Sequence, residues 1–243
     1  MRVHPFVQRL AGESDFHWRG EETTRLEGFS DAVFAFAVTL LVVSLEVPRT
    51  YHELIQAMQG FAPFSFSFAL LASGWFNHYR FFRRYGLEDP WSVFLNCALL
   101  FFVVFFVYPL KFLSVAMFSN DGTLDAGQAR TLFIVYGSGF AAIFLLFLLL
   151  YLHAWRKRRE LGLNEIELLR TRQGLATQLA MMSIGLLSIL LALILPLNLA
   201  GLAGYAYFLI GVYFTVAGTV FGRKESRLKQ SMASPSVDVE EIV

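Results

Sequence analysis

Asp31 is a carboxylate inside an apolar segment of the sequence, Phe29–Val47, and Ser30 precedes it directly. An ionised group is costly in hydrocarbon, so Asp31 is expected to face protein or water and to have a partner. His78 lies near the end of a second apolar segment, at the same depth if the two segments are antiparallel helices. A contact of Asp31 with His78 or with an Arg would offset part of the burial cost. In one interpretation that contact only links two helices. In the other it is a gate or a proton relay, because the His side chain titrates near neutral pH.

Ser30, Asp31 and His78 are poorly placed for a hydrolytic triad, in which a nucleophile, a base and an orienting acid touch one another. Adjacent residues on a helix point about 100° apart, which makes that arrangement awkward. The sequence contains neither G-x-S-x-G nor H-E-x-x-H. Its single cysteine, Cys97, excludes an intrachain disulfide and a cysteine metal cluster. We therefore expect no enzyme activity, no cofactor and no bound metal.

One face of the segment Phe29–Val47 carries an apolar stripe with a single hydroxyl. Phe36, Thr39, Val43 and Glu46 share this face at helical spacing. Copies of the helix around a common axis would form rings of Phe, Thr, Val and Glu over about 15 Å. Apolar rings gate ions by dewetting, and acidic rings enrich cations. The alternative is ordinary helix packing, with the hydroxyl bonded to its own backbone and the Glu at a solvated end.

The composition is that of an integral membrane protein. Of the 243 residues, 56% are hydrophobic and 16% are charged, whereas soluble domains carry about 25% charged residues. A spanning helix needs about 20 mostly apolar residues. Six segments meet this requirement: Phe29–Val47, Phe61–Tyr79, Trp91–Phe118, Arg130–Trp155, Leu175–Leu197 and Leu199–Phe221. We expect an all-α membrane protein with a polar N-terminal segment (1–24), a six-helix domain (25–222) and a disordered tail (223–243).

Lysine and arginine are distributed asymmetrically over the connections between these segments. If the segments span the membrane, 17 of the 20 basic residues lie on the side of the two termini. Only Arg49, Lys111 and Arg130 lie on the other side. The positive-inside rule then places both termini in the cytoplasm of a protein that crosses the cell (inner) membrane several times.

Arg25, Phe29, Ser30 and Asp31 spell R-x-x-x-F-S-D at the head of the first of six predicted spans. This pattern resembles the endolysosomal potassium channel family, in its single-repeat bacterial form. Animal members are similar but contain two six-helix repeats, so one repeat implies an assembly of four chains. The resemblance implies a homotetramer whose pore is lined by the first helices, without the T-V-G-Y-G filter of ordinary potassium channels. This sequence indeed lacks T-V-G-Y-G.

The resemblance also implies roles for single residues. Phe36, five positions after the motif Asp, falls on the main constriction, where aliphatic residues are usual in the family. Thr39 falls on the polar layer and Val43 on a further apolar position, with Leu40 bordering the same face. The motif's polar residues are associated with a network that reaches a His and a Trp of the second span. Those residues are His78 and Trp75 in this sequence.

We therefore predict a homotetrameric, potassium-permeable cation channel in contact with membrane lipid and not with nucleic acid. Its preference for potassium over sodium should be modest, since a Thr ring cannot replace most of an ion's hydration shell. Permeating potassium at Thr39 is the only bound ion expected, with Glu46 at the outer mouth. Two alternatives stay open: a proton-coupled transporter or proton leak that uses Asp31 and His78, and a membrane scaffold or enzyme without conduction. No convincing internal duplication supports the transporter.

Overall fold

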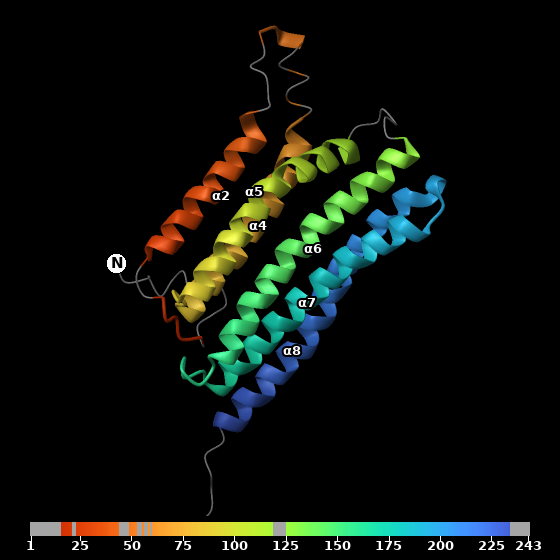
Figure 1. The fold of residues 1–243 in the computed structure, drawn as a ribbon. Helices are drawn as coiled ribbons and strands as arrows, with labels where there is room; N and C mark the ends of the chain where they lie inside the picture. The colour runs from red at the N-terminus through yellow and green to blue at the C-terminus, as the bar shows by residue number, and fades with distance from the viewer. Residues whose placement is uncertain are drawn as a thin grey trace, which may run out of the picture.

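The computed structural model describes residues 16–20, 23–43, 49–52, 55, 58, 60–118 and 125–233. Its long elements are all helical (Figure 1). They are α2 (Arg25–Val43), α4 (Phe61–Tyr85), α5 (Pro90–Phe118), α6 (Ala126–Arg156), α7 (Glu165–Ile194), the 3-10 helix η1 (Leu197–Phe208) and α8 (Leu209–Ala233). An all-helical fold follows, as the apolar segments predicted.

Four stretches of the described chain are long and apolar enough to cross a membrane. These stretches are Pro90–Met117, Ala126–Arg156, Glu165–Ile194 and Leu197–Ser231. They correspond to the third to sixth predicted spans, while α2 and α4 occupy the positions of the first two. The number of six spans therefore stays a prediction for α2 and α4.

Several helix ends differ from the predicted spans because polar side chains continue or cap the helices. Asp125 and Asn164 each form a capping box at the start of α6 and α7, so these helices begin before the apolar residues do. The sixth predicted span begins in the 3-10 helix η1, in which Ala200, Ala203 and Ala206 are buried at three-residue spacing.

The predicted disordered tail, residues 223–243, is corrected in its first half. Helix α8 continues to Ala233. Glu225 pairs with Arg170 of α7 at 2.8 Å and with Lys229 one turn later at 3.0 Å, and these ion pairs stabilise the last turns of the helix. Residues 234–243 lie outside the described part of the chain.

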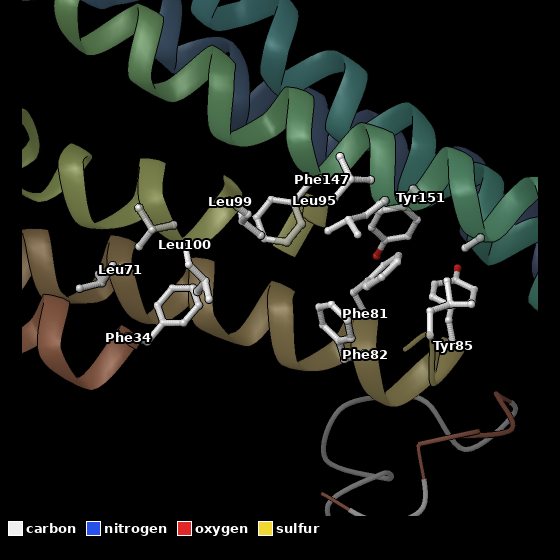
Figure 2. Packing of buried hydrophobic residues seen from close by; sticks show 14 of the residues in the cluster. Phe34, Leu71, Phe81, Phe82, Tyr85, Leu95, Leu99, Leu100, Phe147 and Tyr151 are labelled. Atoms are coloured by element: carbon white, nitrogen blue, oxygen red, sulfur yellow. The ribbon is translucent and has the colours of Figure 1, made fainter. Parts of the chain in front are cut away.

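The helices form two groups that share a hydrophobic core. Helix α2 packs against α4 and α5, whereas α6 packs against α7, and α8 lies along α7 on the far side (Figure 1). Helix α5 contacts α6 and so joins the groups. Figure 2 shows Leu95 and Leu99 of α5 beside Phe147 of α6, with Phe81 of α4 next to Tyr151. The core therefore lies between helices that are far apart in the sequence.

The N-terminal residues 16–20 pack against the end of the bundle where α4 ends. Phe16 is buried and meets the ring of Tyr85 edge-on at 5.8 Å. The chain crosses the end of α4 so closely that a Cβ on Gly86 would lie 3.1 Å from the Arg19 backbone. Gly86 also has φ 58°, which ends α4 in the left-handed conformation that glycine adopts without strain.

Candidate functional site

Helix α2 has one buried face. Glu27, Ser30, Phe34, Ala37 and Leu41 recur at spacings of three and four residues, and each is at most 8% exposed. This face packs against α4 and α5. The rotation of α2 about its own axis is therefore set by contacts within the same subunit.

The opposite face of α2 is uncovered in the single chain. Phe36 is 56% exposed, and Phe29 and Thr39 are exposed on the same side of the helix. The Thr39 hydroxyl donates a hydrogen bond to the Ala35 carbonyl at 2.9 Å, as the packing alternative expected. Thr39 nevertheless points away from the interior of its own subunit. Leu40 is half-buried and packs against the core at the border of this face.

The structure does not describe the side chains of two residues of the predicted stripe. Glu46 is outside the described residues, and of Val43 only the backbone is described, as the last residue of α2. The expectations for these two side chains therefore stay predictions.

A buried polar link joins α2, α4 and α5. The Asn96 amide nitrogen donates to the Ser30 hydroxyl at 2.9 Å, and the Asn96 carbonyl oxygen lies 2.7 Å from Nε2 of His78. Because that oxygen can only accept, Nε2 of His78 carries the hydrogen and donates it. The Ser30 hydroxyl in turn donates to the Leu26 carbonyl at 2.8 Å. All three side chains are at most 1% exposed, and each polar group in this chain of bonds has a partner.

The predicted direct contact between Asp31 and His78 is not made. Asp31 accepts a hydrogen bond from the Trp75 indole at 2.8 Å, on the exposed side of α2. His78 bonds Asn96 instead. The physical reason is that residues 30 and 31 point about 100° apart, so only Ser30 turns into the interior that holds His78. Asn96 was missed in the sequence, where its signal is a single amide inside a long apolar span.

The start of α2 is held by charged residues. Thr24 and Glu27 form a reciprocal pair of bonds between side chain and backbone, which caps the helix. Glu27 also lies 3.4 Å from Nε of Arg83, whose guanidinium donates to the Gly20 carbonyl at 2.8 Å. Arg25, by contrast, is exposed, and no hydrogen bond links it to another described side chain.

The C-terminal part of α2 is held by a lysine of α5. Nζ of Lys111 donates to the Leu41 carbonyl at 3.0 Å, one of the last carbonyls of the helix. A cation at this position also interacts favourably with the helix dipole. Helix α2 is thus anchored at its start, at the Ser30 level and near its end.

Asp89 links the start of α5 to the end of α6. It caps α5 by accepting bonds from the backbone of Trp91 and Ser92, and its carboxylate lies 2.9 Å from Nε2 of His153. Although burial raises the pKa of Asp89, hydrogen bonds from His153 and Ser92 hold that pKa well below its ordinary value. The carboxylate is therefore ionised in the folded protein at neutral pH.

The arrangement does not provide hydrolytic chemistry. The Ser30 hydroxyl bonds a backbone carbonyl and Asn96 rather than a histidine. Within the described ranges, no group of three His, Cys, Asp or Glu side chains could hold a metal ion. What the site offers is an uncovered helix face with one hydroxyl, backed by a rigid polar link.

Comparisons with known proteins agree on one family. A family model described as the endosomal/lysosomal potassium channel TMEM175 matches residues 25–109, which include α2, α4 and most of α5. A potassium channel from Marivirga tractuosa is 37% identical over 233 residues, covering 89% of this chain and 94% of that protein. A potassium channel from Chamaesiphon minutus is 33% identical over 143 residues, covering 55% of this chain and 66% of that protein.

Two crystal structures are also similar. A threonine-to-alanine variant of the potassium channel MtTMEM175, in complex with a nanobody–MBP fusion, gives a TM-score of 0.74 at 36% identity. That match covers 93% of this chain and 100% of the other. The lysosomal potassium-selective channel TMEM175 homologue from Chamaesiphon minutus gives a TM-score of 0.52 at 27% identity, covering 84% and 97%.

Replacement of Asn96 by Leu should destabilise the protein by about 1–3 kcal/mol, because His78 and Ser30 then lose a partner in a buried site. The double variant Asn96→Leu/His78→Phe should recover much of this loss, since both polar partners are then apolar. Thermal unfolding of the detergent-solubilised chain measures both effects. Equal melting temperatures for the single variant and the wild type would contradict the role of the link.

Asp89→Asn should lower the melting temperature at neutral pH, because it removes the charge and keeps a side chain that can cap α5. The folded-state pKa of Asp89 is depressed, so its contribution is complete above the ordinary value of 3.8 and is lost as pH falls through the folded-state pKa. The difference between wild type and variant should therefore shrink in acid below pH 3.8. A melting-temperature difference that stays constant with pH would show that the Asp89 charge does not cause it.

Proposed function

This chain belongs to the TMEM175 family of potassium channels, and we propose that four copies form a pore lined by the uncovered face of α2. The observation that carries the proposal is the contrast between the two faces of this helix. One face is buried and hydrogen-bonded within the subunit, whereas Phe36 and Thr39 are exposed on the other. In a protein whose relatives are potassium channels, a firmly held helix with an uncovered face is suited to line a conduction path.

Small residues support close approach of four copies of α2. Gly28, Ala32 and Ala35 lie on the exposed face, and small residues are enriched where membrane helices pack closely. With these positions near the cytoplasmic end, the helices can converge below the level of Phe36. Phe36 is then the main constriction, which excludes water and ions by dewetting when closed.

Thr39 is the ion-coordinating layer of the proposed pore. Its hydroxyl hydrogen is engaged by the Ala35 carbonyl, so the lone pairs of Oγ1 remain for a cation. Four such oxygens replace only part of a potassium ion's hydration shell, and the preference over sodium is accordingly modest. Val43 is a secondary constriction, Leu40 borders the path and Glu46 lies at the outer mouth.

The motif residues have a supporting role in this mechanism. Ser30 and His78, with Asn96 between them, set the rotation of α2, and the bond between Asp31 and Trp75 holds the cytoplasmic entrance. Arg25 and Phe29 are exposed at the entrance, where they meet neighbouring copies. The distribution of basic residues places both termini in the cytoplasm, with the channel in the cell (inner) membrane.

The alternative of a proton pathway through Asp31 and His78 loses its structural basis. That pathway requires a proton to pass between the two side chains, and they have different partners on different faces of α2. We therefore do not propose a proton-coupled transporter. The family relationship also excludes the reading as an enzyme or a scaffold without conduction.

Thr39→Val should lower the permeability ratio of potassium to sodium about two- to tenfold, because it keeps the shape and removes the coordinating oxygen. Thr39→Ser keeps the oxygen and is the matched control, with a ratio near that of the wild type. Reversal potentials in planar bilayers with asymmetric potassium and sodium measure the ratio. An unchanged ratio in Thr39→Val would remove Thr39 from the conduction path.

Phe36→Ala should raise the unitary conductance, since a smaller side chain widens the dewetted constriction. Phe208→Ala, on the 74% exposed Phe208 of η1, is the matched control because it removes the same ring far from α2. Single-channel recordings of both variants measure the unitary conductance. Equal conductance of Phe36→Ala and the wild type would place the constriction elsewhere.

A further inference from the structure

Helix α4 contacts the second helix group at its C-terminal end, and a cavity opens between them further along α4. At that end Phe81 packs against Tyr151 with ring centroids 5.1 Å apart (Figure 2), and the Tyr85 hydroxyl lies 2.8 Å from that of Thr171. Further into the membrane, a cavity of about 440 Å³ is lined by residues of α4, α5, α6, α7 and α8, and by Phe34 of α2. The closed end therefore forms its floor on the cytoplasmic side.

The α4 wall of the cavity carries three polar side chains among apolar ones. Ser73, Asn77 and Arg80 all line it and recur at spacings of four and three residues, so they share one face of the helix. Polar side chains of membrane helices are costly in lipid and mark sites that bind or conduct polar groups. Arg80 lies nearest the cytoplasm of the three. Its guanidinium is 5.8 Å from the centre of the Phe76 ring.

The opposite wall is mainly apolar but contains one unsatisfied acceptor. Phe140, Phe144 and Phe214 line it, together with Gln178 of α7. Gln178 is 2% exposed, and its side-chain carbonyl oxygen accepts no hydrogen bond from the part of the chain that the structure describes. A buried acceptor without a partner costs free energy, so this site suits a molecule that donates a hydrogen bond.

Arg80 and Gln178 face the cavity at similar depth. Tyr85 and Thr171 are bonded to each other and so lie at one level. Along the axis of α4, Arg80 lies five residues, or about 8 Å, from Tyr85. Along the axis of α7, Gln178 lies seven residues, or about 11 Å, from Thr171. A cation and a hydrogen-bond acceptor therefore flank the cytoplasmic part of the cavity, below an aromatic upper part.

We propose that this cavity binds an anionic glycerophospholipid of the cytoplasmic leaflet whose headgroup carries hydroxyls. The phosphate pairs with Arg80, a headgroup hydroxyl donates to Gln178, and one acyl chain extends between Gly74 and the phenylalanines of α6 and α8. Phosphatidylcholine carries the same phosphodiester, but its trimethylammonium group adds a positive charge that Arg80 repels and has no hydrogen to donate to Gln178, so charge and hydrogen bonding together select the lipid class. The hydroxyl requirement follows from the acceptor at Gln178.

The test is native mass spectrometry of the full chain, solubilised in detergent and titrated with dioleoyl-phosphatidylglycerol or dioleoyl-phosphatidylcholine. The wild type should retain one phosphatidylglycerol per chain and release phosphatidylcholine. Arg80→Gln should weaken retention about fivefold, the attraction of one basic group. The same spectra give the number of chains per particle and so test the proposed tetramer separately from the lipid site.

Gly74→Leu and Gly218→Leu form the matched pair of variants. A Cβ at either glycine meets no heavy atom within 4 Å, so both chains should fold. Gly74 lines the cavity and a Leu there should abolish retention, whereas Gly218 lies on the exposed surface of α8 and a Leu there should have no effect. Retention by Gly74→Leu, equal loss in Gly218→Leu or equal retention of phosphatidylcholine by the wild type would each overturn the proposal.

Discussion

A polar side chain inside a membrane protein must find its hydrogen-bond partners within the protein, and this constraint determines how α2 is placed. Ser30, Asn96 and His78 come from three helices, and each satisfies the next. Turning α2 by one residue would break the bond to Ser30 and bring Asp31 into the apolar core. The link therefore specifies a single orientation of α2. A helix rotated away from it would leave buried polar groups without partners, which costs more free energy than a loss of apolar contacts alone.

The other anchors of α2 act at different depths. Arg83 holds the start of α2 through Glu27 and the residue 20 carbonyl, and Lys111 binds a carbonyl near the end of the helix. The segment that precedes α2 is also tied to the second helix group. Arg19 pairs with Glu167 of α7 at 2.8 Å and donates to the Leu161 carbonyl at 2.7 Å. Because Arg19 lies a few residues before the start of α2, a displacement of this end of α7 would act on α2.

Much of this organisation can be predicted from the sequence, because the physical signals are strong. Long apolar runs specify membrane helices, and a charged motif at the head of the first run led to His78 and Trp75, which bond within the same region of the fold. The pairing of Asp31 with His78 was wrong because depth alone was considered, whereas neighbouring residues on a helix diverge in direction. Asn96 was overlooked since a single amide among apolar residues has no partner that sequence spacing can identify.

Helix boundaries were harder to predict for a different reason. Capping side chains such as Asp125 and Asn164 lie outside the apolar runs, so hydrophobicity does not report them. The ion pairs of Glu225 connect α8 to a residue far away in the chain, and they extend a helix where local composition favours disorder. In both cases the deciding interactions involve polar residues whose partners become known only in the folded chain.

The 3-10 geometry of η1 changes how much membrane its residues can cross. A 3-10 helix rises about 2.0 Å per residue and an α-helix about 1.5 Å, so the 12 residues of η1 extend about 24 Å instead of about 18 Å. Its three-residue period also aligns the methyl groups of Ala200, Ala203 and Ala206 in one straight row. The last predicted crossing of the bilayer thereby gains length without added residues, and its row of small alanine side chains leaves room for a neighbouring backbone to approach.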